Sequence, residues 1–158
     1  MTLRVPQVVL GELHFQQATS ALKALGTISE AFQELAGITQ SNYGHKCNET
    51  TIRNQVRAKI DRWLKNVGGA EISTPVSAID WASVVDAAVW RKPPFTFDPK
   101  DQKNEKGFRD AVILETVAHT CAALPADKLV VFVCNDYLLR TTAESRLQAS
   151  KKFIELAG

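Results

Sequence analysis

RKPPFTFDPKDQKNEKGFRDAVILET, residues 91–116, is the most informative segment of this 158-residue chain. Its first half is polar, contains three prolines and several lysines, and ends at Gly107. Its second half begins with Asp110 and continues as an apolar run that is typical of a packed helix. A carboxylate at the start of a helix can bind a hard cation, and basic side chains beside it can bind phosphate oxygens. The segment therefore indicates a helix that carries an acidic site next to a basic loop.

Two further acidic residues stand in positions that favour a site. The apolar run LVVFVC, residues 129–134, predicts a buried strand and is followed by Asn135 and Asp136. Ligands of parallel α/β sheets bind beyond the carboxyl ends of the strands, which makes Asp136 a second candidate. Glu12 is presented by the helix that begins in VPQVVLGEL, residues 5–13.

Composition predicts an ordinary soluble protein with a single domain spanning residues 1–158. The hydrophobic fraction of 45% is that of a globular chain, and the net charge of +2 is too small to indicate a nucleic-acid partner by itself. Three cysteines without paired spacing argue against disulfides and zinc. No apolar run reaches the roughly 18 residues that a membrane span needs, and no signal peptide is recognisable, so we expect a cytoplasmic protein.

Periodicity and turn residues predict a helix-rich chain with few strands. We expect an amphipathic helix over residues 21–35, with an interruption at 27–30 and a stop at Gly37, and a helix that Ser77 caps. Residues 152–156 fit either the end of the last helix or an edge strand, and the pattern leaves both open. The other expected helices cover residues 6–13, 52–67, 110–123 and 138–153, and the expected strands, which would form one thin sheet, cover 3–5, 70–73 and 129–134.

The stretches VPQVVLGEL, KGFRDAVILET and LVVFVCND, together with the Pro-Pro-Phe and Lys-Gly-Phe-Arg-Asp signature, resemble the PIN-domain family. The resemblance implies an α/β fold, a three-layer sandwich in which a short parallel sheet is flanked by helices. Family members are typically metal-dependent nucleases that act mostly on RNA. Their acidic site usually begins with an Asp in an Asp-Thr-Asn context at the end of the first strand, and this sequence has no such motif. We therefore expect an N-terminally incomplete sandwich, without that strand and its Asp.

The resemblance also implies which residues form the site. Glu12, Asp110 and Asp136 would be the catalytic residues and the ligands of Mg²⁺ or Mn²⁺. Lys106 and Arg109, which are nearest to Asp110 in the sequence, would bind RNA phosphates. The expected activity is that of a divalent-metal-dependent endoribonuclease, weakened by the missing first acid. The expected partners are RNA and either a second copy of the chain or a protein inhibitor, and no membrane.

Two residues beside these acids are weaker candidates. Glu115 lies five positions after Asp110, roughly 140° around a helix, so it would support the site from outside or only pack helices together. Asn135 would orient a water molecule at the site or only form a turn.

The acidic and basic residues also have ordinary structural explanations. Asp110 has the sequence context of a helix N-cap, and an Asn-Asp pair after a strand is common turn chemistry. The basic residues of segment 53–65 indicate a solvated helix face or an extension of a nucleic-acid surface, and Trp63, Trp81 and Trp90 are expected in the core. Two other functions stay open, namely a non-catalytic PIN-like module that binds RNA or protein, and a receiver-like phosphoryl-transfer domain that uses Asp136. The last of these lacks a glycine-rich phosphate loop.

Overall fold

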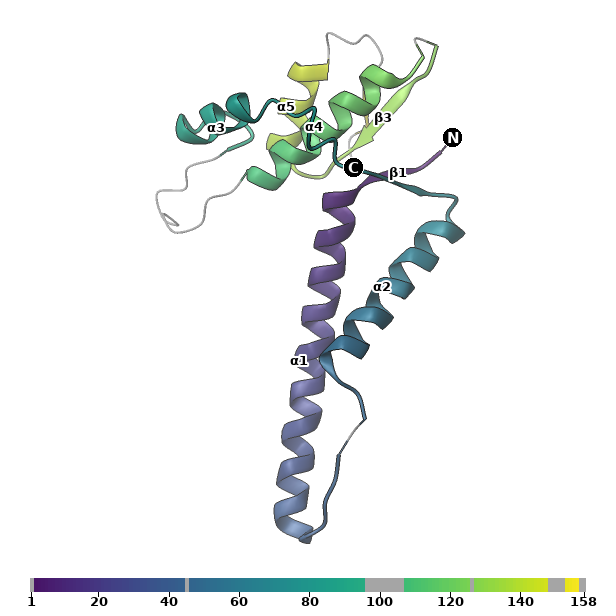
Figure 1. Cartoon of the computed structure of the whole chain (residues 1–158), viewed down its shortest axis with the longest axis vertical. Helices are drawn as coiled ribbons and strands as arrows, with labels where there is room; N and C mark the ends of the chain where they lie inside the picture. The colour runs from purple at the N-terminus through teal and green to yellow at the C-terminus, as the bar shows by residue number, and fades with distance from the viewer. Residues whose placement is uncertain (1, 45, 96–106, 126, 148–152, 157–158) are drawn as a thin grey trace. The chain divides into compact units, whose positions relative to one another are not determined.

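The computed structural model describes the whole chain except residues 1, 45, 96–106, 126, 148–152 and 157–158, and it gives only the backbone of residues 153–156. The chain folds into two compact units. Unit 1 comprises Met1–Val5 and Val9–Glu71, and unit 2 comprises Pro6–Val8 and Ile72–Gly158. Figure 1 shows that helices dominate both units. None of the helices in the described part of the chain is long and apolar enough to span a membrane.

Unit 1 is built mainly from two helices, α1 (Gln7–Thr39) and α2 (Glu49–Asn66). Their contact is apolar, because Leu10 of α1 and Ile60 and Leu64 of α2 form a buried cluster. Val5, Leu13 and Val56 are partly buried against this cluster. The packing joins the first turns of α1 to the second half of α2.

The predicted interruption of α1 at residues 27–30 is wrong. Thr27 and Ser29 lie inside a continuous helix, where their hydroxyls donate to the carbonyl oxygens of Lys23 at 3.3 Å and Leu25 at 3.0 Å. These bonds to the preceding turn satisfy the hydroxyls within the helix, so the polar residues do not end it. The predicted stop at Gly37 is also wrong, since the helix continues to Thr39.

Helix α2 begins three residues before the predicted range 52–67 and ends one residue before its last residue, next to the predicted glycine stop. The Asn48 side chain caps its first turn by accepting a hydrogen bond from the Thr51 N–H at 2.9 Å. After the helix, Gly68 adopts a φ of +66°, a backbone conformation that glycine adopts readily. Strand β2 (Ala70–Ile72) follows and pairs with β1 (Arg4–Pro6).

Unit 2 contains α3 (Trp81–Val89), α4 (Phe108–Ala123), β3 (Val130–Val133), α5 (Tyr137–Leu147) and β4 (Phe153–Leu156). Strands β3 and β4 are parallel, with Val130 opposite Phe153 and Val133 opposite Leu156. The last segment is therefore a strand, which resolves the choice that the sequence left open. A strand–helix–strand unit with a parallel sheet is the expected α/β arrangement. The core of this part is formed by Leu114, Val117, Cys121, Leu139, Ala143 and Leu147.

The strands of the described chain form two separate sheets, β1 with β2 and β3 with β4. The sequence predicted one thin sheet that joined all the N-terminal pieces to β3. This detail is wrong because β3 pairs with β4, whose strand character was undecided. The broader prediction is confirmed, since the chain is helix-rich with a short parallel sheet of the α/β class.

The residue that caps α3 differs from the predicted one. Asp80, rather than Ser77, accepts a hydrogen bond from the Ser83 N–H at 3.2 Å and one from the Ser83 hydroxyl at 2.7 Å. The hydroxyl bond is the main cause of the lowered pKa of Asp80. Ser77 lies in the preceding turn, in which the Pro75 carbonyl accepts from the Ala78 N–H. A small apolar cluster follows, formed by Ile79, Val84, Phe95 and Ala111.

Candidate active site

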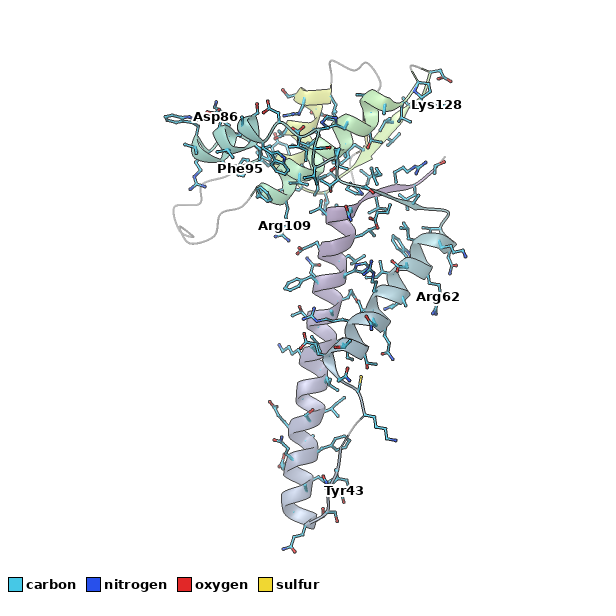
Figure 2. All side chains as sticks on the ribbon, viewed as in Figure 1. Tyr43, Arg62, Asp86, Phe95, Arg109 and Lys128 are labelled. Atoms are coloured by element: carbon cyan, nitrogen blue, oxygen red, sulfur yellow. The ribbon has the colours of Figure 1, made fainter. Side chains whose placement is uncertain are left out.

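The start of α4 is held by close contact between two parts of segment 91–116. Gly107, the N-cap residue, has a φ of +119°. A Cβ atom added there would lie 2.6 Å from the Phe95 Cα and 2.8 Å from the Pro94 carbonyl oxygen. Phe95 is only 2% exposed and packs among α3 and α4 residues (Figure 2). Pro94 and Phe95 thus lie directly against Gly107, and the backbone at the start of α4 leaves no room for a side chain there.

Asp110 is the third residue of α4 and not its cap. Because Gly107 occupies the N-cap position, the explanation of Asp110 as an N-cap does not hold. No hydrogen bond reaches its carboxylate from any described residue. The side chain is half-buried in the first turn, where the positive end of the helix dipole favours a negative charge. Asp110 therefore lies in the first turn of α4 without serving as the cap of that helix.

Asp136 follows β3 and caps α5 with one of its two oxygens. Its Oδ1 accepts a hydrogen bond from the Leu139 N–H at 2.8 Å, and its backbone carbonyl accepts from the Arg140 N–H at 2.9 Å. The turn and cap explanation is thus confirmed for Oδ1. Within the described residues, Oδ2 accepts no hydrogen bond, and the side chain is exposed. The second oxygen can therefore serve a ligand.

The two aspartates influence each other electrostatically. Burial raises the pKa of Asp110, the negative charge of Asp136 raises it further, and the guanidinium of Arg109 lowers it. The pKa of the Cys134 thiol is also raised, chiefly by burial and with contributions from Asp136 and Asp110. Two carboxylates with a shared environment repel each other, and a hard divalent cation with oxygen ligands relieves that repulsion. The donor set of this pair fits Mg²⁺ or Mn²⁺.

Two residues beside the pair were missed by the sequence analysis. The Arg140 guanidinium lies over the ring of Tyr137, 5.6 Å from its centroid, and the Tyr137 side chain is 69% exposed. Arg140 also lowers the pKa of Cys134, which places its charge near that thiol. The sequence could have indicated Arg140, because a residue four positions after the helix cap Asp136 lies one helical turn from it.

The remaining residues predicted for the site differ in their exposure and contacts. Arg109 is exposed in the first turn of α4, and Asn135 is exposed directly before Asp136. Glu115 is buried and paired with Arg146 of α5, with the His119 imidazole 3.9 Å away. This ion pair ties α4 to α5, and a role for Glu115 beside the site stays a prediction. Lys106 lies outside the described residues.

Glu12 belongs to unit 1, whereas the two aspartates belong to unit 2. Its Oε1 accepts a hydrogen bond from the Gln16 side-chain amide at 2.9 Å on the same helix. Its assignment to the site of Asp110 and Asp136 stays a prediction. Across the described residues, no group of three or more His, Cys, Asp or Glu side chains is arranged to hold a metal ion.

Comparison with known families identifies the fold. A family model described as PIN domain matches residues 1–138. The chain belongs to the PIN-domain family. This match confirms the resemblance that the three sequence stretches indicated, and it covers the three acidic candidates. No curated protein and no solved structure gives a significant match to this PIN domain. The PIN fold is a nuclease-type fold, and PIN domains generally depend on divalent metal ions and commonly bind RNA.

Proposed function

We propose that this PIN domain is a divalent-metal-dependent endoribonuclease. The observation that carries the proposal is the interaction between Asp110 and Asp136, two carboxylates from different elements: burial raises the pKa of Asp110, and the negative charge of Asp136 raises it further. Such an arrangement weakens the fold unless a cation compensates it. Asp110 and the Oδ2 atom of Asp136 would hold Mg²⁺ or Mn²⁺, and Glu12 would complete the ligand set.

The chain's own residues would bind and orient the RNA. Arg109, whose charge lowers the pKa of Asp110, and Arg140, which lies one turn of α5 after Asp136, would bind phosphate oxygens on either side of the bond to be cleaved, as charged guanidinium groups do well. Lys106 would add a third cation. When bound, the metal ion supplies the acidity that activates water and the charge that stabilises the departing oxygen. Hydrolysis then adds one water across a P–O bond of the RNA backbone.

The partner and location remain part of the proposal. RNA is the expected substrate, and a second copy of the chain or a protein inhibitor is the expected protein partner. The expected location is the cytoplasm. We infer these from the family and from composition.

The test is cleavage of a fluorescently labelled single-stranded RNA with Mn²⁺ or with EDTA. Cleavage should require the metal, and Asp110→Asn and Asp136→Asn should each reduce it on the order of 100-fold or more, because even residues that only support metal ligands cost tenfold to 100-fold. Asp86→Asn is the matched control, since Asp86 is an exposed acid on α3 that pairs with Lys92 at 2.7 Å. Cleavage by Asp110→Asn at the wild-type rate would refute the proposed site.

A non-catalytic RNA-binding module is the second candidate. The exposed basic residues of α2, which include Arg57, Lys59 and Arg62, favour it because they offer a surface for phosphates that does not involve the aspartates. RNA binding without cleavage by the wild-type chain, and undiminished in Asp110→Asn, would identify the module instead of the nuclease.

A further inference from the structure

Helix α2 carries a basic surface. It has five basic and two acidic side chains, counted along Glu49–Asn66. Within the described residues, one of its cations, Arg53, is paired with Glu49 at 2.7 Å, whereas the other four have no carboxylate within ion-pair distance. All four are exposed. Lys59, Arg62 and Lys65 follow one another at three-residue steps and therefore lie on one side of the helix, and we call these three residues the α2 basic face. Arg57 lies about 160° from Lys59 around the helix axis. Figure 2 shows Arg62 on the side of α2 that faces away from α1.

A hollow of about 220 Å³ lies between α1 and α2, next to this face. Both helices contribute to its lining, in which Gln17, Lys59 and the indole of Trp63 carry polar atoms. The residues that line it are Leu13, Gln17, Val56, Lys59, Ile60 and Trp63. Because Lys59 belongs to both the α2 basic face and the hollow, the two features are continuous.

Trp63 is exposed to solvent and is not a core residue. The sequence predicted it in the core, but its side chain is 48% exposed, and it lies outside the buried cluster of Leu10, Ile60 and Leu64. It follows Lys59 by four positions, so the two side chains neighbour each other on one face, about 6 Å apart along the helix axis. An exposed indole ring next to a lysine side chain can bind a nucleotide, because the ring stacks on the base and the ammonium group binds the phosphate.

We propose that this hollow binds one unpaired nucleobase of a single-stranded RNA whose phosphates lie along the α2 basic face. Trp63 stacks on the base, the Gln17 amide hydrogen-bonds its polar edge, and Lys59 binds the adjoining phosphate. Aromatic side chains beside a cationic track are the usual means of holding single strands. The subsite rests on RNA being the substrate of the proposed nuclease.

RNA fits these observations better than a protein partner does. The cations of the α2 basic face call for a polyanion, which an acidic peptide could also supply. The hollow, however, is small, and its lining includes one indole ring, one side-chain amide and one cation of the α2 basic face. A base offers a flat π surface and hydrogen-bonding edges on the same unit as its phosphate, so it uses all three features at once.

The test is equilibrium binding in EDTA, which prevents metal-dependent cleavage. Fluorescence anisotropy is measured with two labelled probes of equal length, a single-stranded RNA 12-mer and an abasic ribose-phosphate 12-mer. Trp63→Leu keeps an apolar side chain but removes the ring. Its affinity for the RNA should fall roughly 5- to 150-fold, while its affinity for the abasic probe should stay unchanged. Trp63→Phe should recover part of the loss.

Two further variants separate base from phosphate contacts. Arg62→Gln should weaken the binding of both probes and make binding less dependent on salt, because one phosphate contact is lost. Trp90→Leu is the control for the aromatic substitution, since Trp90 is 70% exposed but lies in unit 2. It should bind both probes as the wild type does. Circular dichroism of each variant checks that the helices are intact.

The outcomes distinguish the subsite from the nuclease. If Trp63→Leu binds the RNA as tightly as the wild type, or loses both probes equally, the subsite is refuted even where metal-dependent cleavage is found. If neither probe binds the wild type, the subsite is refuted as well. Loss of RNA binding confined to the Trp63 variants supports the subsite, and it does so whether or not the wild type cleaves RNA with Mn²⁺.

Discussion

Replacement of Gly107 by alanine should destabilise unit 2 and disturb the start of α4. Gly107 has a φ of +119°, which an L-residue avoids because its Cβ approaches the backbone too closely. The added Cβ would also lie 2.6 Å from the Phe95 Cα and 2.8 Å from the Pro94 carbonyl oxygen. Both atoms belong to the backbone, so no side-chain rotation can relieve the contact.

The loss of stability is the sum of two contributions, the unfavourable φ and the close contact of the added Cβ with the backbone. A non-glycine residue in a left-handed conformation costs about 1–2 kcal/mol. Carbon atoms prefer separations of about 3.5–4.0 Å, so the Phe95 backbone would have to move by about 1 Å. Because Phe95 is almost completely buried, this overpacking adds about 1–3 kcal/mol. Gly107→Ala should therefore lower the free energy of unfolding by about 2–5 kcal/mol.

Tryptophan fluorescence during urea unfolding measures this change in a background that carries both Trp63→Phe and Trp90→Phe, where Trp81 is the one remaining tryptophan. Trp81 then reports on the site, because its ring stacks on Phe108, the residue after Gly107, at a centroid distance of 6.3 Å. Gly26→Ala is the matched control, since Gly26 lies inside α1 with no atom within 4 Å of an added Cβ. Because Gly26 belongs to unit 1 and Trp81 to unit 2, this substitution should leave the unfolding midpoint that Trp81 reports unchanged. If Gly107→Ala unfolds at the wild-type urea concentration, the contact between the loop and α4 does not position the site.

Three further substitutions test the surroundings of the site. Because the pKa of Asp110 is raised above its ordinary value of 3.8, the folded chain keeps this proton to higher pH than the unfolded chain does. The contribution of Asp110 to the free energy of unfolding therefore decreases as the pH rises above about 3.8. Asp110→Asn should abolish this decrease, so this variant should be more stable than the wild type in urea unfolding at pH 7. Arg146→Ala should lower the unfolding free energy by about 1–3 kcal/mol, since the Glu115 side chain is only 6% exposed whereas that of Arg146 is 47% exposed, and adding Glu115→Gln should restore part of it. Tyr137→Leu, which removes the ring beneath Arg140, should raise the KM for RNA about two- to fivefold and leave kcat unchanged, and an unchanged KM would show that the ring does not contact substrate.

The helices could be predicted well where apolar residues recur at clear three- and four-residue steps. The start of α4 was readable because Gly107 interrupts the polar loop directly before a periodic run, and the end of α2 was readable from Gly68. The continuity of α1 was not, because the hydrogen bonds of the Thr27 and Ser29 hydroxyls to the preceding turn leave no trace in composition. Residues 153–156 are too few for periodicity to separate strand from helix, and pairing with β3 decides between them.

The site was predicted in part. Asp110 and Asp136 were recognisable from family motifs and from the rule that ligands bind at the ends of parallel strands, and both lie in unit 2 where their charges interact. The positions of the Arg140 and Tyr137 side chains depend on the direction in which α5 runs after Asp136. No local sequence pattern specifies that direction. The exposure of Trp63 depends on how much of α2 its partner helix covers, so an apolar period alone could not reveal it.

Calorimetric titration of Mn²⁺ into the RNA-free protein tests most directly whether the aspartate pair is a cation site. The wild type should bind Mn²⁺, and Asp110→Asn and Asp136→Asn should each weaken that binding at least about tenfold, while Asp86→Asn should bind as the wild type does. Equal Mn²⁺ affinity in the wild type and in Asp110→Asn would contradict the account, because the two carboxylates would then share an environment without sharing an ion.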